Sequence, residues 1–142
     1  MFLISGSGTG SSRLLEKQGY SLVHAFDPLK NTVASFGPVQ ASSEAMTHGA
    51  VYGAANKARC VIHIHSPFLF TSLLAKGFPR TPESVAYGTP ALSHEVARLI
   101  TEELSPSEGV FVTAGHNEGV FTYGESIAST LNLILSLNTT KD

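Results

Sequence analysis

Two histidines separated by a single residue, His63 and His65, stand in the apolar run 61–66. Side chains of a β-strand alternate between its two faces, so both imidazoles point to the same side of such a strand. Two imidazoles at this spacing can share one zinc-like divalent ion, although two half-buried strand histidines explain the pair equally well. A third histidine, His116, follows the apolar strand predicted at 109–114. Three histidine ligands leave the open coordination position that catalytic zinc sites keep.

A carboxylate is predicted to lie on the same helical face as two further side chains. Glu44, His48 and Tyr52 are spaced four residues apart in the segment 42–57, which the sequence predicts to be a helix. A carboxylate near a metal ion can bind the ion or accept a proton from a metal-bound substrate. The spacing alone favours a simpler interpretation, in which Glu44 is an ordinary acid of the first helical turn, stabilised by the helix dipole.

A run of small residues, 5–10, follows the strand predicted at 2–5. Its members Ser7 and Gly8 can offer a hydroxyl and a bare backbone N–H to a phosphate, and Ser42 and Ser43 can do the same near a helix start. The run also raises the alternative of dinucleotide or methyl-donor binding. Its spacing is Gly-x-Gly-x-Gly rather than Gly-x-Gly-x-x-Gly, and the following strands do not alternate with helices, so this alternative is disfavoured.

The bulk composition limits the classes of partner. The chain has 142 residues, of which 42% are hydrophobic, so we predict one domain spanning 1–142. A net charge of −2 provides no basic surface for nucleic acid or acidic lipid. There is no bilayer-spanning apolar run and no signal peptide pattern. The single cysteine, Cys60, is expected to lie in the core as a free thiol. The charge, the missing targeting patterns and this free thiol together predict a cytoplasmic protein with neither membrane nor nucleic-acid partners.

The elements that must position these side chains are predicted from hydrophobic periodicity and turn residues. Strands are predicted at 2–5, 20–27, 32–36, 60–66, 110–114 and 120–123, and helices at 42–57, 67–76, 90–104 and 126–137. The segment 77–89, with its prolines and glycines, is predicted to be a loop. Short turns between neighbouring strands favour an α/β fold of the layered α+β kind, in which helices flank a central, mostly antiparallel sheet.

Taken in order, five motifs resemble the class II aldolase and adducin family. They are Ile4-Ser5-Gly6-Ser7-Gly8, Ser42-Ser43-Glu44-x3-His48-x3-Tyr52, His63-Ile64-His65-Ser66-Pro67, Tyr87-Gly88-Thr89-Pro90-Ala91-Leu92 and Gly115-His116-Asn117-Glu118-Gly119. The resemblance runs from about Ile4 to Leu131 and covers most of the chain. It implies a class II aldolase-like sheet flanked by helices, and a homo-oligomer, usually a cyclic tetramer.

The resemblance also implies a role for each motif residue. Zinc, the metal it implies, would be held by His63, His65 and His116, and Glu44 would be the catalytic base; Ser7, Gly8, Ser42 and Ser43 match positions that hold a substrate phosphate. The implied activity is a lyase of carbohydrate metabolism, an aldolase-type C–C cleavage or related dehydration of a small hydroxy-carbonyl compound such as a sugar phosphate. Relatives that epimerise sugar phosphates carry Asp where Glu44 stands, which favours a lyase over an epimerase.

Two departures from the family pattern keep a second function open. The sequence begins after the helices and the Gly-Asn-x-Ser loop with which family members usually start, and the stretch between His65 and Gly88 is short. The proton-donating tyrosine of the aldolases belongs to that stretch, and Tyr52, Tyr87 and Tyr123 are equal candidates to replace it. The alternative is therefore a non-catalytic binding or assembly module that retains the fold, like the adducin head.

Overall fold

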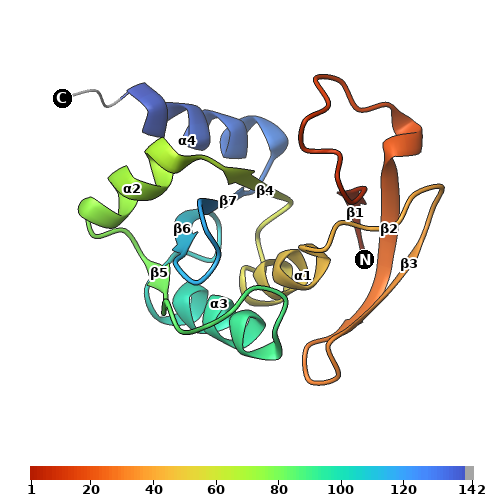
Figure 1. Cartoon of the computed structure of the whole chain (residues 1–142), viewed down its shortest axis with the longest axis horizontal. Coiled ribbons are helices and arrows are strands. Elements are labelled where there is room, and N and C mark those ends of the chain that lie inside the picture. Colours follow the sequence, from red (N-terminus) through yellow and green to blue (C-terminus); the bar gives the residue numbers. More distant parts are fainter. Residues whose placement is uncertain (140–142) are drawn as a thin grey trace.

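The computed structural model describes residues 1–139 and folds them into two β-sheets and four α-helices (Figure 1). The strands are β1 (Phe2–Ser5), β2 (Tyr20–Asp27), β3 (Thr32–Phe36), β4 (Cys60–His65), β5 (Arg80–Thr81), β6 (Gly109–Thr113) and β7 (Gly119–Gly124). The helices are α1 (Ala45–Ala54), α2 (Pro67–Ala75), α3 (Pro90–Glu102) and α4 (Ile127–Thr139), and a short 3-10 turn spans Lys17–Gly19. This layered α+β arrangement confirms the predicted fold class. Within the described residues, no helix has the length and apolar character needed to cross a membrane.

The larger sheet has the strand order β4-β7-β6-β5, and it lies between two pairs of helices (Figure 1). Because strand side chains alternate, Phe111, Phe121 and Tyr123 point to one face, where they pack with α1 and α3. Val112 and Val120 point to the other face, where they pack with α2 and α4. The face that carries the aromatic residues is also the face of His63, so α1 and α3 lie on the side of the histidines.

The smaller sheet, β1-β2-β3, is antiparallel and packs against α1. Its β2–β3 turn follows the predicted hairpin chemistry, because the Asp27 carboxylate accepts hydrogen bonds from the N–H groups of Leu29 and Lys30. Helix α1 approaches this sheet closely, since a Cβ on Gly49 would lie 2.9 Å from the ring of Phe26. The small helix residue therefore sets how near the smaller sheet lies to α1.

The structure departs from the sequence-based prediction at three places. The strands form two sheets rather than one, and two residues of the predicted loop 77–89 form β5, which pairs parallel to β6. The helix predicted at 42–57 is shorter at both ends, because residues 42–44 form the turn that enters α1. That turn matters for the site, since it carries Glu44 and both serines.

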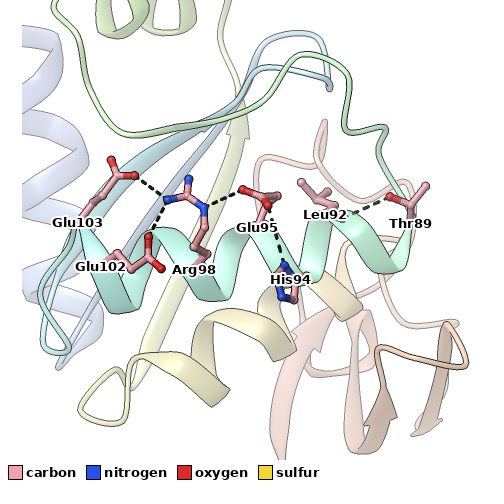
Figure 2. A network of polar contacts seen from close by, with 7 residues as sticks. All are labelled: Thr89, Leu92, His94, Glu95, Arg98, Glu102 and Glu103. Carbon is pink, nitrogen blue, oxygen red and sulfur yellow. Dashed lines mark hydrogen bonds and ion pairs between the residues drawn. The ribbon is translucent and has the colours of Figure 1, made fainter.

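Helix α3 illustrates how local chemistry fixes an element beside the site (Figure 2). The Thr89 hydroxyl accepts a hydrogen bond from the N–H of Leu92, and Pro90 occupies the first turn, as is typical of helix starts. Along the exposed face, Arg98 binds Glu95 at 2.9 Å, Glu102 at 3.1 Å and Glu103 at 3.0 Å. This one guanidinium offsets acids that would otherwise be unfavourable at the negative end of the helix dipole.

Candidate metal centre

The three predicted histidines lie together. His63 and His65 project from β4, and His116 projects from the turn between β6 and β7. One ring nitrogen of each residue lies within 4.8 Å of the others, and in the described part of the chain this is the group of side chains that could hold a metal ion. The Nε2 atoms of His63 and His65 are only 3.1 Å apart.

The hydrogen bonds of these two rings determine which nitrogens carry hydrogen. His63 Nδ1 lies 3.2 Å from the carbonyl oxygen of Val120, and His65 Nδ1 lies 3.1 Å from that of Asn117. A carbonyl oxygen can only accept, so each Nδ1 donates. In the neutral rings the Nε2 atoms then carry lone pairs, and two lone pairs face one another across 3.1 Å. Two facing lone pairs repel each other unless a positive charge lies between them. In addition, a hydrogen bond from Nδ1 to a backbone carbonyl is typical of a histidine that binds metal through Nε2.

The turn that carries His116 is fixed by its own backbone. The N–H of His116 donates to the carbonyl of Thr113, and the N–H of Gly119 donates to that of His116. Glu118 adopts the left-handed conformation at φ 64°, and its carbonyl accepts the N–H of Ser66 just after β4. The same turn thus contacts the strand that carries the other two histidines.

Gly115 lets this turn lie directly on the loop before α3. A Cβ at this position would overlap the carbonyl oxygen of Val85 and approach that of Glu83. We therefore expect Gly115→Ala to displace His116 and to weaken binding of Zn²⁺ by at least tenfold, measured by competition with a chromogenic chelator. Gly53→Ala is the matched control, because a Cβ there meets nothing within 4 Å. Equal zinc affinity in the two variants would contradict this account of the turn.

Glu44 points into the histidine cluster rather than capping its helix. It is the N-cap residue of α1, makes no side-chain cap hydrogen bond, and is only 5% exposed. Its Oε1 lies 3.5 Å from His63 Nε2 and 3.1 Å from His116 Nδ1, and neither carboxylate oxygen has a partner in hydrogen-bond geometry. Burial raises the pKa of this carboxyl, and the Thr47 hydroxyl and His65 offset part of the rise. Glu44 is therefore a buried carboxylate at the N-cap, and not the ordinary acid of the first helical turn that the spacing alone favours.

The ring of His63 is held in place by an aromatic column. Phe121 stacks on it with centroids 4.1 Å apart and planes at 21°, and Phe111 stacks on Phe121 at 5.1 Å and 2°. Burial is the main reason that the pKa of His63 is lowered to about 3, and His65, His48 and His116 lower it further. The imidazole is thus neutral at physiological pH, which is the form that binds a metal ion.

His48 of α1 is a half-buried histidine that is not part of the ligand set. Its ring meets the edge of Phe121 at 5.7 Å, and burial lowers its pKa to about 4. In the unfolded chain His48 is protonated near pH 6.5, whereas in the folded chain it is protonated only near pH 4. The folded state therefore loses stability relative to the unfolded state as the pH falls through this range. We expect His48→Phe to reduce the loss of unfolding free energy between pH 7 and pH 4.5 by about 2 kcal/mol.

Urea unfolding of the metal-free protein at pH 7 and pH 4.5 measures this effect. The control is His94→Phe, because the His94 side chain is 83% exposed. A pH dependence that is the same in wild type and His48→Phe would contradict the assignment.

A cleft of about 1720 Å³ opens onto the cluster. Among the predicted phosphate-binding residues, Gly8, Ser42 and Ser43 line it together with Glu44 and the three histidines. The Ser42 hydroxyl accepts the N–H of Glu44 and keeps its own hydrogen to donate. Ser7 is not among the lining residues, and its backbone N–H donates to the carbonyl of Gln40. The structure thus brings three of the four predicted residues to the cleft.

The sequence did not predict that two further residues, Tyr87 and Cys60, line the cleft. Tyr87 lies against His116 with ring centroids 4.4 Å apart, and no periodicity in the loop 77–89 could have indicated this contact. Cys60, expected in the core, is half-buried and lines the cleft at the start of β4. Tyr123 is fully buried, its hydroxyl donates to the carbonyl of Ser105, and it does not line the cleft.

Comparison with known proteins identifies the family of this chain. Residues 1–140 match the family described as the Class II Aldolase and Adducin N-terminal domain. Alpha-adducin of Mus musculus is 29% identical and that of Rattus norvegicus 28% identical over 100 residues, which cover 63% of this chain and 13% of each adducin. The chain thus spans only a small part of these relatives, and no solved structure matches it significantly. The family match over nearly the whole sequence shows that the chain belongs to the class II aldolase and adducin N-terminal domain family.

Proposed function

We propose that this protein is a divalent-metal-dependent lyase that cleaves a C–C bond in, or dehydrates, a small hydroxy-carbonyl compound. The observation that carries the proposal is the pair of facing Nε2 atoms of His63 and His65, with a buried carboxylate beside them. Two lone pairs at this distance fit a cation, and three imidazoles suit zinc, the metal we propose. His63, His65 and His116 would hold the ion, which supplies a Lewis acid that polarises a substrate carbonyl.

Glu44 is the residue that we propose moves the proton. Its carboxylate is buried, and its Oε1 faces the rings of His63 and His116. The raised pKa makes the carboxylate a stronger base than an exposed glutamate, which suits proton transfer near neutral pH. In this proposal its Oε1, which lies near His63 and His116, takes a proton from a substrate hydroxyl and returns it to carbon.

The cleft supports a small polar substrate. Gly8, Ser42 and Ser43 lie in the same cleft as Glu44 and offer a backbone N–H and two hydroxyls to an anionic group. We propose that this end of the cleft holds a phosphate or carboxylate of the substrate, with Ser7 contributing from the same loop. The family match also supports a homo-oligomer, which we propose as the assembled form.

The test is a cleavage screen with zinc-loaded protein on phosphorylated and free ketoses and 3-hydroxy acids. Aldehyde or ketone release is followed with a coupled dehydrogenase. We expect turnover of at least one compound by the wild type and none by His63→Ala. A zinc-loaded wild type that turns over none of the panel would contradict the lyase proposal.

The matches to the two adducins favour a second candidate, a binding or assembly module without catalysis. Such a module needs the fold but not the buried carboxylate. It therefore predicts that Glu44→Gln leaves every measurable property of the protein, apart from stability, unchanged. The lyase proposal predicts the opposite, so this one variant separates the two.

A further inference from the structure

Tyr87 is the tyrosine whose ring lies on the histidine cluster. Its ring is tilted 33° to that of His116, with centroids 4.4 Å apart, and the residue is 37% exposed in the cleft. Nothing in the described part of the chain forms a hydrogen bond with its hydroxyl. The phenol therefore offers the cleft one polar group beside the ligand set.

The other tyrosines are engaged elsewhere or lie away from the cluster. The hydroxyl of Tyr123 donates to the carbonyl of Ser105, and Tyr52 packs on Phe2 with ring centroids 5.0 Å apart. Tyr20 lines the same cleft from β2, and it makes no ring contact with a histidine among the described residues. Among the tyrosines that the structure describes, Tyr87 is thus the one whose ring contacts a histidine of the cluster.

The loop that carries Tyr87 is fixed from three sides. The Thr89 hydroxyl donates to the carbonyl of Ala86 at 2.7 Å, and the Asn31 amide, from the β2–β3 turn, donates to the carbonyl of Gly88 at 3.0 Å. The backbone at Val85 lies directly against Gly115, next to His116. A loop held in this way presents the phenol at one place, which a ligand-contacting group requires.

We propose that Tyr87 contacts the substrate, and that its hydroxyl donates a hydrogen bond to an oxygen of the ligand bound at the three-histidine site. The inference rests on the proposed metal-dependent function and adds to it a residue that selects oxygen-rich ligands. A ligand in the open position of the cluster lies beside His116, and therefore beside the ring that covers it. The ring forms one wall of the site, and the hydroxyl adds polarity to that wall.

The test uses acetohydroxamic acid, which binds divalent metals through two oxygens, as the probe. Its dissociation constant is measured on Co²⁺-loaded protein from the visible cobalt spectrum, in wild type, Tyr87→Phe and the matched control Tyr20→Phe. We expect Tyr87→Phe to keep its cobalt and to bind the probe about threefold to tenfold more weakly, as loss of one hydrogen bond implies. Tyr20→Phe should bind like wild type.

Equal affinity of Tyr87→Phe and wild type would overturn the inference, and so would an equal loss in both tyrosine variants. A wild type that binds no cobalt would overturn the proposed metal function itself, and the inference with it, before any variant is compared. A wild type that binds cobalt and the probe but cleaves no substrate would contradict the lyase proposal alone. In that case a weaker Tyr87→Phe complex would still support the contact.

Discussion

Glu44→Gln should lower the rate of substrate cleavage by about 10²–10⁴-fold, the range that a positioned acid–base group contributes. The substitution keeps the size and shape of the side chain but removes the group that can take up a proton. Metal content should remain close to that of the wild type, because the three histidines are unchanged. Stability should not fall, since burial disfavours the charged form of this carboxyl and a neutral amide of the same shape avoids that cost.

Steady-state kinetics and metal analysis on the same preparation measure both properties. Glu95→Gln is the matched control, because Glu95 is a surface acid of α3 bound to Arg98 (Figure 2). A variant with unchanged turnover would remove Glu44 from the reaction. A variant that loses its metal would instead assign Glu44 as a ligand.

Phe121→Ala should have the largest effect on stability. The side chain is fully buried, and it stacks between Phe111 and His63. Truncation of a buried phenylalanine to alanine costs about 3–5 kcal/mol through lost burial and the remaining cavity. Because the ring also supports His63, metal affinity should fall together with stability.

Phe111→Ala separates these two effects. Phe111 is equally buried and belongs to the same core cluster, and its stacking partner is Phe121 rather than a histidine. Urea unfolding should give similar losses for the two variants, whereas zinc affinity should fall further in Phe121→Ala. If both variants lose the same zinc affinity, the stacked ring does not position His63.

Much of the fold follows from local pattern. The strand at 2–5, the hairpin strands 20–27 and 32–36, and the strand that carries both histidines are found within one residue of the prediction. Each has either strict alternation or a strong turn at its end. The two-residue strand β5 could not be predicted, because Arg80 and Thr81 owe their extended pairing to β6, which is distant in sequence. The division into two sheets likewise depends on tertiary contacts that periodicity does not encode.

The candidate site likewise contains residues that the sequence predicted and residues whose positions it did not predict. His63 and His65 were predictable because strand geometry places them on one face, and His116 because its turn follows a strand. The burial of Glu44 was not, since helical spacing alone favoured an ordinary acid of the first helical turn, and the contacts of its carboxylate with His63 and His116 join segments that are distant in sequence. Tyr87 was missed as a neighbour of His116 because the contact joins two loops. The three histidines were therefore predictable from neighbouring strands, whereas the surroundings of Glu44 and Tyr87 depend on contacts between segments distant in sequence.

The central claim is that the three histidines form one metal site, and elemental analysis of metal per chain tests it most directly. The measurement compares wild type, His63→Ala, His116→Ala and the surface control His94→Ala after loading with Zn²⁺ and removal of excess metal. Circular dichroism first establishes that each variant is folded. The account predicts about one zinc per chain in wild type and His94→Ala and almost none in the other two. A wild type that retains no metal, or variants that retain as much as the wild type, would contradict it.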